Sequence, residues 1–422
     1  MIRILYSLLL LLLSPVLLFT LLRTKQGKPA VGARWSEYFG ITPRLNEQKP
    51  IWIHTVSVGE TIAATPFIKA LKQAHPDQPI LITTTTTTGA EQAEKLGSLV
   101  THRYMPIDFS WCVRLFLRSI QPRCLIIMET ELWPNTLHCV ANTNIPIIVL
   151  NARLSERSYA RYNKVLPIFK SISQNISHFI CQHQDDAIRF IQLGVAKDRV
   201  SISGSLKFDI DIAPDITKRA VSLRESLGKH RPVWIAASTH AGEDEQLLDA
   251  HRLLLEHIPD ALMIIVPRHP ERFEQVMSLS QQSGFNTVSR TSQLKITSDT
   301  QVYLADTMGE MLLLIGSADI CFMAGSLIGD KVGGHNPLEP AALSKPILNG
   351  SSYFNFSDIT HQLQGNDAVT ICDSSQQIAI QLRHLISNPN QSTQMGLRAL
   401  EVVKHNQGAV QKSVQAVSEF ID

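Results

Sequence analysis

From residue 51 onward, short apolar, β-branched runs alternate with segments whose apolar residues recur every three or four positions. This is the pattern of buried strands followed by amphipathic helices. In the first half it predicts strands at 51–56, 79–84, 124–128, 146–150, 177–181 and 199–203, and helices at 60–74, 89–97, 109–119, 133–141, 156–173 and 184–193. The alternation predicts a mostly parallel sheet with helices on both faces.

A second series follows residues 209–215, a polar stretch with Pro214 that we interpret as a linker. It predicts strands at 233–237, 261–266, 301–304, 318–323, 346–348 and 368–372, and helices at 243–257, 270–282, 308–316, 337–343, 356–364 and 375–388. A chain of 422 residues is long enough for two such domains. We therefore expect two Rossmann-like halves with the ligand in a cleft between them, and a helical tail at 392–421 that could pack back on the first half.

The amino-terminal segment 4–22 is mostly leucine, and as a helix it would be about 28 Å long, close to the thickness of a bilayer. Four basic residues follow it: Arg23, Lys25, Lys28 and Arg34. By the positive-inside rule they predict an uncleaved anchor with the rest of the chain in the cytoplasm. Pro15 leaves open whether this helix spans the membrane or only embeds in it.

The distribution of charge and the spacing of the cysteines limit the binding partners and metal sites that the sequence allows. The first 50 residues carry a net charge of +5 and the remainder −3, which favours an anionic surface near the amino terminus over nucleic acid. The six cysteines are scattered without metal-site spacing, so we expect buried thiols, no zinc site and no disulfides. Asp209 and Asp211 match D-x-D, but no His, Asp or Glu cluster supports them, so we predict no metal.

Glu60 follows the strand 51–56 and the small residues 57–59, which places it in the first turn of a helix at the carboxyl edge of the sheet. The helix dipole favours a carboxylate there, so we expect Glu60 to be ionised and able to take a proton. The alternative is an ordinary acidic residue that stabilises a helix terminus.

Two more charged groups follow strands of the first half. Glu129 and Glu131 come directly after the strand 124–128, where two close carboxylates could share acid–base chemistry, unless one of them holds a neighbouring cation. Lys207 follows the last strand and could offset developing negative charge, or be a solvated loop lysine. Residues 151–170 carry a net charge of +4, which fits either a solvated helix face or contact with anionic headgroups or an anionic acceptor.

In the second half, Arg268 emerges at the end of the strand 261–266, where it could hold a phosphate. Arg272 fits a surface turn, and Asp306 or Thr307 fits a cap on the helix that follows.

The segment 333–339, Gly-Gly-His-Asn-Pro-Leu-Glu, predicts a glycine loop with Asn336 as N-cap and Pro337 as first helical residue. The free N–H groups at such a helix start attract phosphate, and Glu339 could accept hydrogen bonds from ribose hydroxyls. The alternative is a plain glycine loop with a capped helix.

Seven motifs occur in order along the chain: Ser57-Val-Gly-Glu60, Met128-Glu-Thr-Glu-Leu-Trp-Pro-Asn135, Asn151-Ala-Arg-Leu-Ser155, Gly204-Ser-Leu-Lys-Phe-Asp209, Pro267-Arg-His-Pro-Glu-Arg272, Asp306-Thr-Met-Gly-Glu310 and Gly333-Gly-His-Asn-Pro-Leu-Glu339. Together they resemble the 3-deoxy-D-manno-octulosonic acid (Kdo) transferases of lipopolysaccharide synthesis, over essentially the whole chain.

The resemblance implies a GT-B fold, with an anchor at 1–23, an acceptor-binding domain at 24–210 and a donor-binding domain at 211–422. It also implies metal-independent, inverting transfer of Kdo from CMP-Kdo to lipid IVA on the cytoplasmic face of the inner membrane. By motif match, Glu60 falls on the catalytic base, and Glu129 and Lys207 fall on positions that stabilise the transition state. The CMP-binding positions are Pro267, Arg268, Met308, Gly309, Glu310, Asn336, Pro337, Leu338 and Glu339. Two rivals remain, another membrane-associated GT-B transferase that uses a UDP-sugar and a non-catalytic nucleotide-binding membrane scaffold.

Overall fold

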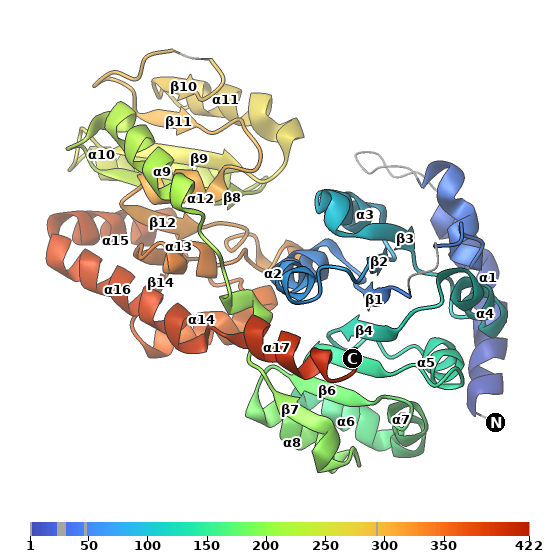
Figure 1. The fold of residues 1–422 in the computed structure, drawn as a ribbon. Coiled ribbons are helices and arrows are strands. Elements are labelled where there is room, and N and C mark those ends of the chain that lie inside the picture. Colours follow the sequence, from blue (N-terminus) through green and yellow to red (C-terminus); the bar gives the residue numbers. More distant parts are fainter. Residues whose placement is uncertain (1, 23–30, 46–48, 293, 422) are drawn as a thin grey trace. The chain divides into compact units, whose positions relative to one another are not determined.

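The computed structural model describes residues 2–22, 31–45, 49–292 and 294–421. Its chain forms two compact units. Unit 1 comprises Met1–Asp209 together with Asn406–Asp422, and unit 2 comprises Ile210–His405 (Figure 1). Each unit is an α/β fold built on one parallel sheet, as the alternation of strands and helices predicts.

The sheet of unit 1 has seven strands in the order β3-β2-β1-β4-β5-β6-β7, all parallel. The strands are β1 (Ile51–His54), β2 (Ile80–Thr84), β3 (Thr101–Tyr104), β4 (Cys124–Met128), β5 (Ile147–Ala152), β6 (His178–Cys181) and β7 (Val200–Ile202). The helices between them are α2 (Val58–Ala74), α3 (Thr87–Glu94), α4 (Ser110–Ile120), α5 (Pro134–Ala141), α6 (Glu156–Lys164), α7 (Leu166–Ser173) and α8 (Gln184–Gln192).

Alternate residues of β1 face opposite sides of this sheet, so the strand feeds two cores. Ile51 and Ile53 pack with Phe67 of α2 on one face. Trp52 packs on the other face against Phe116 of α4, with ring centroids 5.2 Å apart. Because both faces are covered, all four residues of β1 are buried, which explains why the strand is apolar without alternation.

The sheet of unit 2 also has seven parallel strands, in the order β10-β11-β9-β8-β12-β13-β14. They are β8 (Val233–Thr239), β9 (Leu262–Pro267), β10 (Thr287–Ser289), β11 (Val302–Leu304), β12 (Ile320–Met323), β13 (Ile347–Asn349) and β14 (Val369–Ile371). The helices are α9 (Pro214–Gly228), α10 (Asp244–Leu255), α11 (Phe273–Gln282), α12 (Met311–Ser317), α13 (Leu338–Ala342), α14 (Ser357–Gly365), α15 (Ser375–Ser387) and α16 (Pro389–Asn406).

Four elements differ from the prediction. The strands β3 and β10 are missing from it because they are short edge strands with polar residues, so no apolar run marks them. The helix α9 is also missing, although Pro214 stands at its first position, where proline is favoured. The predicted helix 156–173 divides into α6 and α7 at Val165, because Pro167 cannot continue a helix from residue 164.

The last helix, α17 (Ala409–Ser418), packs on α2 within unit 1. Its amino terminus is held by Asp209, whose carboxylate accepts hydrogen bonds from the backbone N–H groups of Gly408 at 2.7 Å and Val410 at 2.5 Å. Farther along, Arg123 donates to the carbonyl of Ile421 at 2.7 Å. The Asp209 carboxylate of the D-x-D pair is therefore occupied by the start of a helix.

The leucine-rich segment forms α1 (Ile2–Leu22), which lies along unit 1 (Figure 1). Arg3 donates to the side-chain oxygen of Asn135 at 3.3 Å, and the Asn135 amide donates to Ser7 Oγ at 3.0 Å. Among the helices that the structure describes, none combines the length and apolarity needed to cross a bilayer.

Candidate active site

Glu60 stands in the first turn of α2, directly beyond the carboxyl end of β1. Ser57 caps the helix, because its Oγ accepts from the Glu60 N–H at 3.3 Å. The Glu60 carboxylate folds back over this turn and accepts from the backbone N–H of Val56 at 2.8 Å and from Ser57 Oγ at 3.1 Å. The Ser57 cap and these two bonds fix the carboxylate at the sheet edge.

Burial raises the pKa of Glu60 to about 7, because the loss of hydration outweighs the two hydrogen bonds that favour the charged form. The negative charges of Glu129 and Glu131 raise it further. Burial thus opposes the helix dipole, which is expected to favour the ionised form of Glu60. Near neutral pH the group is divided between both forms, which suits a general base.

Glu129 and Lys207 lie at the same edge. The Lys207 ammonium is 3.9 Å from Glu129 Oε1, both side chains being about one-third exposed. Glu129 follows β4 with a φ of 58°, a left-handed conformation that non-glycine residues adopt mainly where the surroundings require it. The structure thus brings the three predicted residues Glu60, Glu129 and Lys207 together, and Glu129 is the carboxylate that holds a cation.

Lys207 is positioned by a second left-handed residue. Asn151, near the end of β5, has a φ of 56°, and its side-chain oxygen accepts from the N–H of Leu206 at 3.1 Å. This bond holds the short helical turn Leu206–Phe208, which carries Lys207. The nearby carboxylate of Glu131 accepts a hydrogen bond from the indole N–H of Trp133 at 3.0 Å.

In unit 2, Arg268 and Glu339 are the predicted residues available to a ligand. Arg268 follows β9, and its backbone N–H donates to the Thr239 carbonyl at 3.0 Å. Within the described residues, neither the Arg268 guanidinium nor the Glu339 carboxylate makes a hydrogen bond to the chain. Burial raises the pKa of Glu339 to about 7, while the nearby charge of Arg268 lowers it. A ligand can therefore contact both groups without breaking a hydrogen bond within the protein.

Three histidines surround Arg268, and no motif in the sequence predicts that they meet. The Nε2 atoms of His240 and His335 are 2.8 Å apart with stacked rings, and His269 meets His240 edge to face at 5.4 Å. Burial and the nearby cations lower the pKa of His240 to about 4 and that of His335 to about 3, so both are neutral at pH 7. Their positions could have predicted that they meet, because the carboxyl ends of parallel strands lie at one edge of the sheet. His240 follows β8, His269 follows β9 and His335 lies in the glycine loop.

Glu243 organises the loop that follows β12, a role that the sequence pattern does not predict. This fully buried carboxylate accepts from four backbone N–H groups, those of His240, Gly325, Ser326 and Leu327, at 2.7–3.1 Å. It therefore fills the row of N–H groups in this loop, as an anion would.

The glycine loop and α13 differ in detail from the prediction. The helix begins at Leu338 with Pro337 in the cap position, and Asn336 instead accepts from the Leu338 N–H at 3.2 Å. Gly333 has a φ of 81°, and a Cβ there would lie 2.4 Å from the Phe354 ring. Glycine is thus required at Gly333 by both backbone conformation and space.

Glu310 is tied to the protein. Arg290 holds its carboxylate with two hydrogen bonds of 2.6 and 2.9 Å, and Thr307 donates at 2.6 Å. These bonds lower the pKa of Glu310 to about 2. Of its predicted neighbours, Met308 is exposed and Gly309 has a φ of 81°. Asp306 accepts from Thr291 rather than capping α12.

The prediction that Arg272 lies on a surface turn is wrong. The Arg272 side chain is only 11% exposed, and it forms a salt bridge with the Asp244 carboxylate, whose side chain is 2% exposed. Arg272 also donates to the Thr239 carbonyl at 2.9 Å, and Thr239 Oγ1 donates to Asp244 at 2.6 Å. This pair joins the ends of β8 and β9 to α10 and so supports the edge that carries Arg268.

All six cysteines are buried free thiols, as expected: Cys112, Cys124, Cys139, Cys181, Cys321 and Cys372. In the part of the chain that the structure describes, no three His, Cys, Asp or Glu side chains are grouped as a metal site would need.

Solved structures with similar architecture show the fold that the two units share with known proteins. A glycosyltransferase from Rickettsia africae covers 89% of this chain and 99% of its own, at 13% identity and a TM-score of 0.57. HepE from Anabaena, solved with UDP and glucose, covers 88% and 99% at 13% identity and a TM-score of 0.52. The C-terminal CMP-Kdo binding domain of WaaA from Acinetobacter baumannii is 36% identical over 46% of this chain and 100% of its own, with a TM-score of 0.43. Two Rossmann-like α/β units of this kind are the fold of GT-B glycosyltransferases.

Sequence comparison then gives the family. The family model of 3-deoxy-D-manno-octulosonic-acid transferase (kdotransferase) matches residues 33–210. The 3-deoxy-D-manno-octulosonic acid transferase of Haemophilus influenzae is 36% identical over 100% of this chain and 99% of its own length. That of Bordetella pertussis is 29% identical over 88% and 87%. The chain belongs to the Kdo transferase family, and it is a Kdo-transferring glycosyltransferase of lipopolysaccharide biosynthesis.

Proposed function

We propose that this enzyme transfers Kdo from CMP-Kdo to lipid IVA with inversion at the anomeric carbon, and that Glu60 is the general base. The observation that carries the proposal is the group at the carboxyl edge of unit 1. There a half-buried glutamate with a pKa of about 7 stands near Glu129, which lies 3.9 Å from Lys207. A base whose pKa lies near the working pH transfers protons efficiently.

In the proposed reaction, a hydroxyl of the acceptor sugar gives its proton to Glu60. Its oxygen forms a bond to the anomeric carbon of Kdo, and the bond from that carbon to the phosphate oxygen of CMP breaks. The bonding electrons leave with CMP, a phosphate monoester that needs no strong general acid. Lys207 offsets negative charge as it develops.

Unit 2 is the proposed donor-binding unit. Arg268 would contact the phosphate and Glu339 the ribose hydroxyls. The availability of both groups supports this assignment, since Arg272 and Glu310 are already held by partners in the chain. The remaining positions that match the family motif would shape the nucleotide site: Pro267, Met308, Gly309, Glu310, Asn336, Pro337 and Leu338.

We also propose that α1 holds the enzyme at the inner membrane with both units on the cytoplasmic face, and that no metal takes part. The basic residues after α1 and the leucines exposed on it support a membrane contact. Phospholipid would then be a partner, and nucleic acid would not.

Mass spectrometry of lipid IVA after incubation with the enzyme and CMP-Kdo tests the reaction directly and counts the sugars added. Inhibition by CMP and not by UDP would exclude a transferase that uses a UDP-sugar. A membrane scaffold without activity would leave both lipid IVA and CMP-Kdo unchanged, and that result would overturn the proposal.

The pH dependence of transfer should show the titration of Glu60. Because only the carboxylate accepts a proton and its pKa is about 7, kcat/KM for the acceptor should fall roughly tenfold per pH unit below that value. Initial rates between pH 5 and pH 9 would measure this limb. Rates that stay level down to pH 5, as they would for a glutamate with its ordinary pKa of about 4.3, would contradict the base assignment.

Replacing Lys207 tests the electrostatic role. Lys207→Met should lower kcat by about 10²–10³-fold, the typical effect of losing one group that stabilises transition-state charge. Lys207→Arg, which keeps the charge, should retain more activity than Lys207→Met. The matched control is Lys197→Met, an exposed lysine on the same unit. Equal activity of the Met and Arg variants would show that the charge is not what matters.

A further inference from the structure

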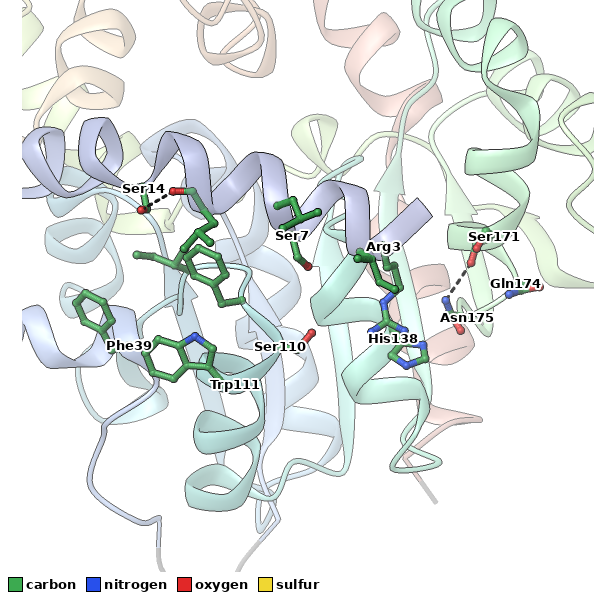
Figure 2. Close-up of a pocket in the computed structure, with 15 residues that line it drawn as sticks. Arg3, Ser7, Ser14, Phe39, Ser110, Trp111, His138, Ser171, Gln174 and Asn175 are labelled. Atoms are coloured by element: carbon green, nitrogen blue, oxygen red, sulfur yellow. Dashed lines mark hydrogen bonds between the residues drawn. The ribbon is translucent and has the colours of Figure 1, made fainter. Parts of the chain in front are cut away.

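A cavity of about 1040 Å³ lies between α1 and the body of unit 1, and no step of the proposed reaction uses it. Figure 2 shows that it extends along α1 from Ser14 past Ser7 to Arg3. The opposite wall comes from Phe39, the segment 107–111, His138 of α5, and Ser171 of α7 with the residues that follow it. It is thus a groove roofed by one helix.

One end of this groove is apolar. The roof there is formed by Leu8 and Leu11 of α1. The wall presents Phe39 and Trp111, whose rings stack at 6.2 Å, together with Ile107 and Phe109. Apolar surface of this kind is stabilised when hydrocarbon replaces water.

The other end is polar and basic. Figure 2 shows Arg3 above His138, with Ser171, Gln174 and Asn175 beyond them. Arg3 keeps its place because its Nε donates to Asn135, which in turn donates to Ser7. A guanidinium beside hydroxyl and amide groups is suited to a phosphate.

The outer side of α1 explains where such a ligand would come from. Leu5 is 71% exposed and Leu12 is 77% exposed, and further leucines of the helix are also turned outward. A contiguous leucine surface is typical of contact with a membrane. The groove would then open where phospholipid is far more abundant than any other amphiphile.

We propose that this groove binds one acyl chain of an anionic membrane phospholipid, with the lipid phosphate at Arg3 and His138 and the chain beneath Leu8 and Leu11. The combination of a basic end and an apolar end matches an anionic amphiphile and neither a sugar nor a nucleotide. The bound lipid would fasten α1 to unit 1. This inference rests on the proposed membrane contact of α1 and not on the proposed reaction.

Photo-cross-linking tests the groove directly. The full-length protein is placed in phosphatidylcholine vesicles that contain phosphatidylglycerol with a diazirine on its acyl chain, and the cross-linked peptides are identified by mass spectrometry. We expect cross-links at Leu8, Leu11 and the groove residues Ile107, Phe109, Ser110 and Trp111, and loss of these after competition with unlabelled phosphatidylglycerol. Cross-links confined to the outer leucines of α1 would overturn the proposal, as would displacement by lipid IVA and not by phosphatidylglycerol.

Two pairs of variants separate the groove from general membrane contact. Ser110→Trp fills the groove and should reduce the cross-link at 107–111 about tenfold, whereas Leu12→Trp, on the exposed side of α1, should not. Arg3→Glu should reduce labelling by phosphatidylglycerol, whereas Arg118→Glu, exposed on α4, should not. Unchanged labelling in both groove variants would refute the site. Kdo transfer is assayed separately, so failure here leaves the proposed reaction standing.

Discussion

Glu60→Gln is expected to lower kcat for Kdo transfer by about 10²–10⁴-fold, the usual contribution of a general base. The amide keeps the size of the side chain. Its oxygen can still accept from the Val56 N–H and its NH2 group can donate to Ser57 Oγ, so the turn at the start of α2 should remain. It cannot take a proton from the acceptor hydroxyl. Initial rates with CMP-Kdo and lipid IVA measure the loss, and calorimetric binding of CMP should be unchanged.

The control for this variant is Glu91→Gln, which removes an exposed carboxylate from α3 in the same unit. It should leave kcat and the binding of CMP unaltered. A Glu60→Gln enzyme with near-normal turnover would remove Glu60 from the role of base. A variant that had also lost CMP binding would instead indicate damage to the fold.

Arg272→Met is expected to destabilise unit 2 by about 3–5 kcal/mol, because it leaves the buried Asp244 carboxylate without its cation. Burial already raises the pKa of Asp244, and Arg272 is the main charge that opposes this effect. The measurement is chemical denaturation followed by circular dichroism and by tryptophan fluorescence, to which Trp234 contributes from unit 2. Adding Asp244→Asn should recover part of the loss, since the neutral amide removes the unpaired charge.

Arg252→Met provides the matched comparison. Arg252 pairs with Asp249 on α10, but the two side chains are 50% and 57% exposed, so the loss should be about 1 kcal/mol or less. If the two arginine variants lost equal stability, the burial of the Arg272–Asp244 pair would not be its decisive feature.

The chain's local pattern predicts both parallel α/β units and many of their helix and strand positions. A run such as Ile51–His54 is largely apolar because it is buried on both faces, and the turn at 57–60 carries its own N-cap, Ser57. Because Glu60, Glu129 and Arg268 each directly follow an apolar strand, their place at a sheet edge also follows from sequence. Edge strands such as β3 and β10 do not give this signal, because they are short and polar.

What each group can do at that edge was decided by the tertiary structure. Arg268 and Arg272 stand in one motif, yet Arg272 is held by Asp244, 28 residues away, and the Arg268 guanidinium has no such bond among the described residues. Likewise Glu310 is held by Arg290, and His240, His269 and His335 converge from three segments. The pKa of Glu60 rises because surrounding elements remove water from it.

The sequence by itself therefore determined the fold class, the family and the residues that reach the sheet edges, since periodicity, capping and motif order are local properties. Only the tertiary structure decided which of those residues are already paired, which histidines meet, and how far Glu60 is from its ordinary pKa. Burial and pairing depend on distances between segments remote along the chain, and local pattern does not contain those distances.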